Sequence, residues 1–188
     1  MRALAVFLTS IFILSGCTTV VDSVTSKPFD PDPSSTSMGT AIDDIKMDTF
    51  IGVNIKKADP QLDKSHININ VVNRVVLLTG EVPTAALKKK AGDVARAYKD
   101  VRQVYNELQV RGKTSIVSRT DDTLLTGKIK TKLMFNDKIK ASNIEVVTED
   151  SVVYLMGTVD RATADLAGKI ASDSSGVRKV VRVFEYID

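Results

Sequence analysis

The stretch that decides the fold occurs twice, as RVVLLTGEV at residues 74–82 and as SVVYLMGTV at residues 151–159. Each copy is a β-branched run that passes into a Leu-x-Gly-x-Val pattern, and such a run predicts a buried strand. A shorter apolar run stands at the same distance before each of them, at residues 67–71 and 144–147. Constant spacing of similar segments indicates an internal repeat. The sequence therefore predicts two equal modules, joined near residues 111–119.

A helix is predicted to open each module. In the first copy Thr40 precedes Asp43 at the spacing of a capping box, and residues suited to a helix face then recur at helical intervals. In the second copy the helix is expected to start at Thr120 or Asp121, with an apolar residue at every fourth position. The first series is Ile42, Ile45, Thr49 and Val53, and the second is Leu125, Ile129 and Leu133.

Two strands, a second helix and a third strand are predicted to follow. Polar segments at residues 72–74 and 148–151 separate the two β-branched runs, which indicates a hairpin. Gly80 and Gly157 are expected to let the backbone turn out of the sheet. The second helix is expected to begin after Pro83-Thr84 in one copy and at Asp160 in the other, and the third strand to cover residues 105–110 and 181–187.

This element order predicts the architecture of each module. A strand-helix-strand crossover within one sheet is right-handed almost without exception, so the third strand should lie parallel to the second, with both helices on one face. Apolar alternation in the third strand predicts one covered face and one face open to water. The expected fold class is α+β, with two tandem αββαβ modules, each a two-layer sandwich of two helices on a three-stranded mixed sheet.

The first residues are predicted to form an export signal. Arg2 gives a positive start, and residues 4–14 are apolar apart from Thr9 and Ser10. A membrane-spanning helix needs about 20 apolar residues, roughly twice as many as stand here. The segment ends in LSGC, at residues 14–17, which resembles the lipobox of bacterial lipoproteins. An ordinary secreted protein with a chance cysteine at its cleavage site is the alternative.

The lipobox resemblance implies cleavage before Cys17, a diacylglycerol on its sulfur and an acylated amino terminus. Several acyl chains hold a protein on its membrane almost permanently. Thr18 rather than aspartate after the cysteine implies delivery to the outer membrane, facing the periplasm. Three prolines and many polar residues then predict an extended tether. We therefore expect a signal peptide at 1–16, a lipidated N-terminus and flexible tether at 17–39, a first module at 40–112, a linker at 113–120 and a second module at 121–188.

Composition argues against most catalytic classes. The chain has one cysteine, one histidine and no tryptophan, and its net charge of +3 is too small and too mixed to indicate nucleic-acid binding. No phosphate loop, metal-ligand spacing or catalytic-triad pattern is present in the sequence. His66 has no acidic partner nearby in the sequence and is expected to be structural or at the surface. We expect no enzyme activity, cofactor, metal site or small-molecule substrate.

The strand pattern, the alanine-bearing second helix and Gly176-Val177-Arg178-Lys179-Val180 before the last strand resemble the BON domain. The resemblance covers both modules. The first module departs from it, because Lys99-Asp100-Val101 stands where a Gly-Val turn is expected. Either a less sharp turn or a slightly longer helix is expected there. With a lipobox, a tether and two copies, the chain resembles the dual BON-domain lipoproteins of the Gram-negative outer membrane.

That resemblance implies that the first helix of the second module binds anionic phospholipid. It also implies a role in envelope integrity, concentration at the division site and no catalytic activity. The family's binding helix corresponds here to Leu124, Leu125, Gly127, Lys128, Ile129, Lys130, Thr131 and Met134. Related proteins can place a tryptophan where this chain has Leu124, and leucine lacks the preference of tryptophan for the headgroup region.

The same helix can be analysed without the family. If the 125, 129, 133 stripe faces the sheet, the opposite face is unusually apolar and is flanked by lysines, as in interfacial helices. That face holds Leu124, Gly127, Lys128, Thr131, Met134 and Phe135, and the lysines are Lys130, Lys132, Lys138 and Lys140. Alternatively, Leu124 and Met134 pack against the first module. A second hypothesis is a tethered adaptor for envelope assembly proteins, without lipid recognition beyond the anchor.

The first helix of the first module is expected to be an interface element instead. Its apolar residues Met47, Phe50, Ile51 and Ile55 spread widely around the helix, and Asp43, Asp44 and Asp48 accompany its lysines. The run at residues 88–90 is three lysines, which usually form a solvated face.

Overall fold

The computed structural model describes residues 38–112 and 116–187. Both modules belong to one compact unit. The predicted signal peptide, the lipid-anchor residue Cys17 and all but the last two residues of the predicted tether lie outside the described residues. Among the described helices, none is both long enough and apolar enough to cross a membrane.

The α+β class is confirmed, and both modules contain the predicted helix, two strands, helix and third strand, with an added short helix and a divided third strand in the first module. The first contains α1 (Met38–Ala58), α2 (Pro60–Lys64), β1 (His66–Val72), β2 (Val75–Val82), α3 (Ala85–Arg96), β3 (Gln103–Asn106) and β4 (Gln109–Val110). The second contains α4 (Ile116–Met134), the short 3-10 turn η1 (Ala141–Asn143), β5 (Ile144–Glu149), β6 (Val152–Val159), α5 (Arg161–Ser172) and β7 (Lys179–Tyr186).

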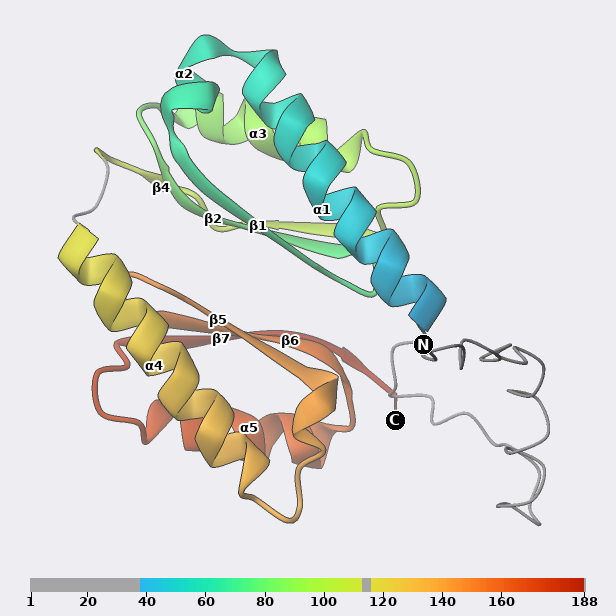
Figure 1. Ribbon diagram of the computed structural model, residues 1–188, viewed down its shortest axis with the longest axis vertical. Coiled ribbons are helices and arrows are strands. Elements are labelled where there is room, and N and C mark those ends of the chain that lie inside the picture. Colours follow the sequence, from blue (N-terminus) through green and yellow to red (C-terminus); the bar gives the residue numbers. More distant parts are fainter. Residues whose placement is uncertain (1–37, 113–115, 188) are drawn as a thin grey trace, which may run out of the picture. The chain divides into compact units, whose positions relative to one another are not determined.

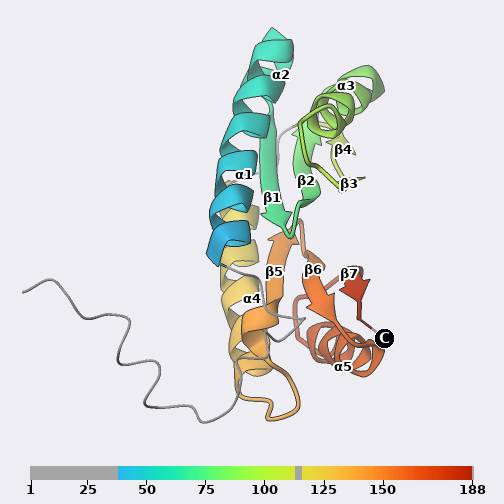
Figure 2. The ribbon, with the colours of Figure 1, turned by 90° about the vertical axis from the view of Figure 1, so that its right-hand side faces the viewer.

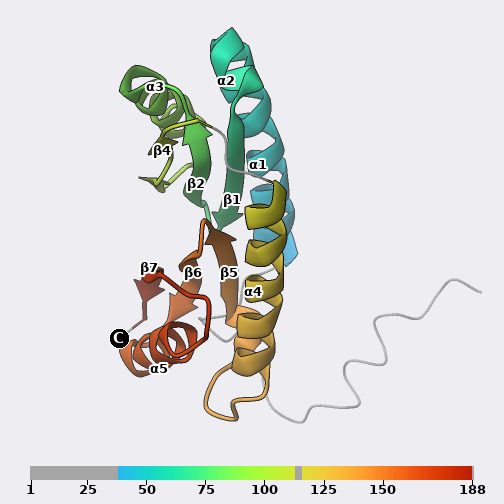
Figure 3. The same cartoon turned by 90° about the vertical axis from the view of Figure 1, so that its left-hand side faces the viewer.

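Within each module the sheet has the predicted topology. β1 and β2 form an antiparallel hairpin, and β3 and β4 both run parallel to β2. β5, β6 and β7 repeat this arrangement. Figure 1 shows both helices of each module on one face of its sheet. α1 lies along β1 in Figure 2, and α4 lies along β5 in Figure 3.

Three details of the first module differ from expectation. The short helix α2 was not predicted, although Asp59 caps it through Gln61 N and Pro60 occupies its first position. The third strand is interrupted at residues 107–108 and so consists of β3 and β4. The turn before β3 is not less sharp than its counterpart, because Asp100 takes φ 67° where Gly176 takes φ 101°. Aspartate is one of the few residues that adopt this left-handed region readily.

One aspartate in each opening helix holds the hairpin of its own module. The turns are the residue pairs 73–74 and 150–151, and all four residues have positive φ, as a two-residue type I′ turn requires. Asp44 accepts hydrogen bonds from the backbone N–H of Asn73 at 2.7 Å and of Arg74 at 2.9 Å. Asp122 accepts the equivalent pair, at 2.7 and 2.8 Å. Each buried carboxylate therefore fastens a helix to a turn.

The two strand glycines were expected to let the backbone turn out of the sheet, but the strands continue past them. Gly80 lies inside β2 with φ 109°, and Gly157 lies inside β6 with φ 144°. A Cβ at these positions would stand 2.2 Å from the carbonyl oxygen of His66 and 2.0 Å from that of Asn143. The glycines are thus needed because the neighbouring backbone comes too close for a side chain.

The helix-facing side of each sheet forms a hydrophobic core. In α4 the predicted stripe is confirmed, with Leu125, Ile129 and Leu133 all buried. In α1 the predicted stripe is wrong, since Ile42, Ile45 and Val53 are exposed. The buried residues are instead Met47, Ile51 and Ile55, which follow Asp44 along the helix. The hairpin-holding aspartate, rather than apolar content, sets the rotation of α1.

The opposite face of each sheet was expected to be open to water, and this expectation is wrong. A separate cluster of buried residues joins that face of β2 to that of β6 and β7. Its buried members are Val75, Leu77, Tyr154, Met156 and Val183. Burial is the main reason that the pKa of Tyr154 is raised to about 12. The alternation that predicted an exposed face fails here because part of that face is covered by the other module.

Polar contacts flank this shared cluster. The side-chain amide of Asn73 donates to Thr158 Oγ1 at 2.9 Å, and Arg102 pairs with Glu185 at 2.6 Å. Arg111 contacts Asp150 at 3.0 Å and, at a longer 3.5 Å, Glu81. Position 73 of the first module corresponds to 150 of the second, and 81 corresponds to 158. Asn73 and Thr158 therefore contact each other directly, whereas their counterparts Asp150 and Glu81 are bridged by Arg111.

Candidate functional site

The helix α4 has one buried face and one exposed face. It begins at Ile116, within the predicted linker and before the predicted start at Thr120 or Asp121. Leu125 and Ile129, which the family resemblance includes in the binding helix, are 7% and 0% exposed. Their side chains fix the helix to its sheet, so Ile129 offers no surface to a ligand and Leu125 offers little.

The remaining predicted residues largely share the opposite face. We call the exposed set the α4 ridge, and it consists of Leu124, Gly127, Lys128, Thr131, Met134 and Phe135. Leu124 and Met134 are each 68% exposed and Phe135 is 82% exposed. Leu124 and Met134 thus do not pack against the first module in this structure. Three large apolar side chains on one helical face, spread over about 16 Å, form an unusual surface for a protein in water.

Lysines of α4 lie beside the ridge and differ in their partners. Lys130 forms an ion pair with Glu145 at 2.8 Å and is half-buried. Lys128 donates to the backbone carbonyl of Ser175 at 3.2 Å, and Lys132 donates to Ser174 Oγ at 2.9 Å. The acceptors of Lys128 and Lys132 are neutral, so these two ammonium groups keep their charge available to an anion. The turn after α5 therefore positions two cations next to the ridge.

A surface depression of about 390 Å³ lies next to Leu124. It is lined by Asp121, Leu124, Leu125, Lys128, Ser151, Ser175 and Gly176. Leu124 provides an apolar wall, Lys128 a positive charge and Asp121 a negative charge. The sequence did not place Ser175 and Gly176 beside α4, because they are distant from it in the chain and polar or small.

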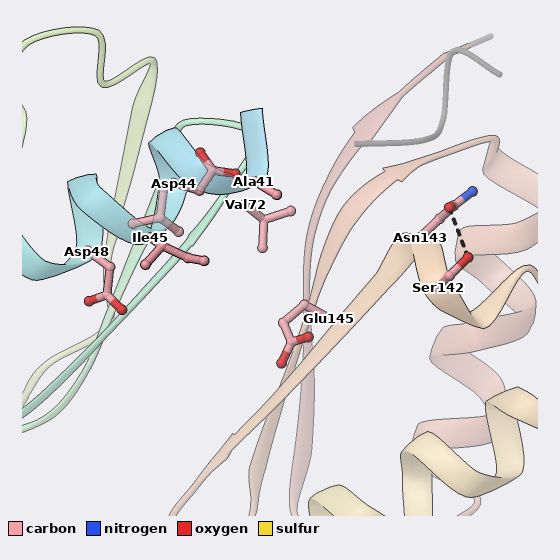
Figure 4. Close-up of a pocket in the computed structure, with 9 residues that line it drawn as sticks. Ala41, Asp44, Ile45, Asp48, Val72, Ser142, Asn143 and Glu145 are labelled. Carbon is pink, nitrogen blue, oxygen red and sulfur yellow. Dashed lines mark hydrogen bonds between the residues drawn. The ribbon is translucent and has the colours of Figure 1, made fainter. Parts of the chain in front are cut away.

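The equivalent helix of the first module offers a different surface. Ile42, Ile45 and Phe50 are exposed on α1, and the ring of Phe50 stacks on that of Tyr98 with 6.4 Å between centroids. Figure 4 shows Ile45 between the carboxylates Asp44 and Asp48 at a depression of about 310 Å³, in which Ser142 and Asn143 are hydrogen-bonded to each other. Partial burial raises the pKa of Asp48. The depression is thus apolar and acidic, which is unsuited to an anionic ligand, whereas the exposed lysines of α1 lie outside its lining.

Other candidate residues fall outside this site. Cys17 lies outside the described residues. The lysine run at 88–90 is on α3, where Lys89 pairs with Asp93 at 2.6 Å and Lys90 with Asp59 at 3.1 Å, as expected of a solvated face. His66 has acidic neighbours that the sequence could not indicate, because Glu81 and Glu149 come from distant segments.

Comparison with known proteins finds the same domain twice. The BON domain family matches residues 54–112 and 121–188. The chain is 35% identical to the outer membrane lipoprotein DolP of Haemophilus influenzae, over 100% of this chain and 97% of that protein. It is 32% identical to the 21 kDa hemolysin of Actinobacillus pleuropneumoniae, over 86% of this chain and 81% of that protein. It is also 32% identical to osmotically-inducible protein Y of Escherichia coli, over 79% of this chain and 75% of that protein.

Proposed function

Because this chain belongs to the BON domain family and is an outer-membrane lipoprotein similar to DolP, we propose that it is a non-catalytic protein that binds anionic phospholipid through the α4 ridge. The observation that carries the proposal is the exposure of Leu124, Met134 and Phe135 beside lysines whose acceptors are neutral. Interfacial helices combine apolar anchors with cations in this way.

The energies involved are adequate only when the groups act together. Each lysine near an anionic surface contributes about 1 kcal/mol. A fully buried leucine or methionine side chain contributes roughly 1.5–3 kcal/mol, and partial insertion contributes less. Leu124, Met134 and two lysines together contribute about 5–8 kcal/mol, which corresponds to dissociation constants between about 0.2 mM and about 1 μM, whereas any one of them alone contributes too little for stable binding.

The anchor and the ridge have different roles in this proposal. Cleavage after the signal peptide at residues 1–16 leaves Cys17 as the acylated first residue, and residues 17–39 serve as the tether. Since several acyl chains already hold the protein at the membrane, the α4 ridge adds little to residence. It instead concentrates the tethered protein where anionic lipid is enriched, such as the division site, and in this way supports envelope integrity.

Vesicle sedimentation of residues 33–188, produced without the anchor, tests the proposal. We expect binding to anionic vesicles and not to zwitterionic ones, and a loss of at least about tenfold in affinity for Leu124→Asp, since both an apolar contact and charge complementarity are removed. Ile45→Asp is the matched control, because Ile45 on α1 is also 68% exposed. Binding that survives Leu124→Asp unchanged would exclude the α4 ridge as the site.

The adaptor hypothesis has a specific observation in its favour, the apolar and acidic surface of α1 around Ile45 and Asp48. In that case the lipid anchor supplies location only, and the partner is an envelope assembly protein with a basic, apolar surface. A stable protein complex that is lost on Ile45→Asp, together with no vesicle binding at low salt, would favour the adaptor over the lipid-binding function.

A further inference from the structure

Three side chains with metal-binding chemistry meet at one end of the cluster that joins the modules. His66 begins β1 and Glu81 lies in β2, where the two residues are register partners. Glu149 ends β5 of the second module. One ligand atom from each residue lies within 4.8 Å of the others. The first module thus supplies a nitrogen and an oxygen ligand, and the second supplies one oxygen ligand.

Glu81 is buried, and its carboxylate is not fully hydrogen-bonded. It is 1% exposed, and its Oε2 has no hydrogen-bond partner. Its Oε1 has only a 3.5 Å contact with Arg111, whose shorter contact, 3.0 Å, is with Asp150. A buried carboxylate with an unsatisfied oxygen is costly unless a cation or a proton compensates it.

The side-chain amide of Asn68 contacts both Glu149 and His66. Glu149 is 7% exposed, and its Oε2 accepts a hydrogen bond from the Asn68 amide at 2.8 Å. The same amide nitrogen lies 3.2 Å from Nε2 of His66, and that Nε2 is 3.8 Å from Oε1 of Glu149. Nε2 has a single lone pair, so a metal bound there would replace the Asn68 amide as its partner. The hydrogen bond from Asn68 to Oε2 of Glu149 would remain, and it leaves Oε1 of Glu149 to the metal, as an outer-shell contact to a carboxylate ligand does.

We propose that His66, Glu81 and Glu149 bind one Zn²⁺ ion between the two modules. One imidazole and two carboxylates with a fourth position for water match the preference of zinc for four mixed ligands, whereas Ca²⁺ takes six to eight oxygens. Tetrahedral ligands at 2.0–2.2 Å stand about 3.4 Å apart. The 3.8 Å between Nε2 of His66 and Oε1 of Glu149 is already close to this value.

The opposite end of the cluster shows what an ion-free version of this contact contains. There the counterpart of Glu81 is Thr158, which accepts a hydrogen bond from Asn73 at 2.9 Å. Two neutral groups satisfy each other directly and need no cation. The counterparts of His66 and Glu149 are Asn143 and Val72, so the group of one imidazole and two carboxylates is not repeated at the opposite end. The zinc ion has a structural role in this proposal, since it would tie the first module to the second.

Zinc titration calorimetry of the full-length mature lipoprotein in a non-ionic detergent, after removal of metal with a chelator, tests the proposal. We expect one Zn²⁺ per chain and a zinc-dependent rise in melting temperature. His66→Ala, Glu81→Gln and Glu149→Gln should each weaken binding by at least about 100-fold, because loss of an outer-shell partner alone costs 10–100-fold. Cobalt in place of zinc should give the visible absorption of a four-coordinate nitrogen and oxygen site.

Two matched controls separate this site from chance surface binding. Asp93→Asn removes an exposed carboxylate that is paired with Lys89, and Thr158→Ala changes the opposite end of the cluster. Both should leave zinc affinity within about twofold of the parent chain. If Glu81→Gln does not fold, His66→Ala decides, since the His66 side chain is 22% exposed. Absence of saturable binding, or an unchanged affinity in His66→Ala, would overturn the proposal.

Discussion

The helices α1 and α4 open equivalent modules, and they share one face while differing in the other. On the shared face, Asp44, Met47, Ile51 and Ile55 occupy the positions of Asp122, Leu125, Ile129 and Leu133. On the outer face, Lys46, Lys56 and Lys57 stand where α4 has Leu124, Met134 and Phe135. The aspartate and the three apolar residues after it therefore define the module, whereas the outer face is free to acquire a separate function.

The largest expected effect comes from breaking the shared scaffold at its strand glycines. Gly157→Ala places a Cβ 2.0 Å from the backbone oxygen of Asn143 at φ 144°. Because only backbone movement relieves this contact, we expect a loss above about 4 kcal/mol of unfolding free energy, measured by urea denaturation. Gly80→Ala should act in the same way on the first module. Gly127→Ala is the control, since its Cβ meets open space on the α4 ridge and should stabilise the helix by about 1 kcal/mol.

The next largest effect is expected from the hairpin-holding aspartates. Asp122→Ala removes two hydrogen bonds to a carboxylate, at 2.7 and 2.8 Å, and leaves two turn N–H groups without their acceptor. Hydrogen bonds to charged groups contribute about 1.5–3 kcal/mol each, so we expect a loss of about 3 kcal/mol in urea denaturation. The neighbouring Asp121 is exposed, and Asp121→Ala should change stability by less than about 0.5 kcal/mol. Equal effects of the two substitutions would contradict the role assigned to Asp122.

A smaller effect is expected when the outer face of α4 is given the residues of α1. The triple variant Leu124→Lys, Met134→Lys and Phe135→Lys keeps the buried face intact, and all three side chains are more than two-thirds exposed. We expect vesicle affinity to fall about 10–100-fold at 0.5 M salt, where lysine attraction is screened and the lost apolar contacts dominate. The circular dichroism spectrum should be unchanged. Retained affinity at high salt would show that the outer faces do not differ in function.

The smallest effect concerns the caps of the second helices, which also differ between the modules. Thr84 caps α3 through Leu87 N, and Asp160 caps α5 through Thr163 N. The hydrogen bonds from Thr163 lower the pKa of Asp160 below its usual value. A carboxylate with a lowered pKa in the folded state stabilises the fold at pH values above its unfolded pKa of about 3.9. This stabilisation is lost as the pH falls from there through the folded-state pKa.

We therefore expect the urea midpoint of the parent chain to fall between pH 5 and pH 3 by more than that of Asp160→Ser, which caps without titrating. Thr84→Ser is the control, because neither threonine nor serine titrates in this range. It should leave the pH dependence of the urea midpoint as it is in the parent chain. A parallel pH dependence in the parent chain and Asp160→Ser would show that this carboxylate does not contribute to acid lability.

The sequence predicted what depends on local pattern and on repetition. The element order, the parallel third strand and the buried stripe of α4 all follow from residues close in the chain. The stripe of α1 could not be predicted in the same way, because Asp44 is polar yet buried against a turn 29 residues away. Apolar content alone therefore placed Ile42 and Ile45 on the wrong face.

What the sequence missed depends on contacts between the modules. Leu77 and Tyr154 stand on strand faces that alternation predicted to be wet, and only the presence of the other module buries them. His66 acquires its acidic neighbours in the same way, since Glu149 is 83 residues distant in the chain. The α4 ridge was predictable because exposure of Leu124 and Met134 follows from burial of Leu125 and Leu133 on the same helix.

The apolar cluster around Leu77 and Tyr154 also bears on what a lone copy of this module would do. Such a copy would present Val75 and Leu77 to water on a face whose equivalent positions already contact each other in the tandem chain. A self-complementary face of this kind pairs two identical subunits about a twofold axis. The covalent link supplies a partner at an effective concentration of about a millimolar, so the pairing does not depend on expression level. The tandem arrangement thus amounts to a dimer with fixed stoichiometry that dilution cannot separate.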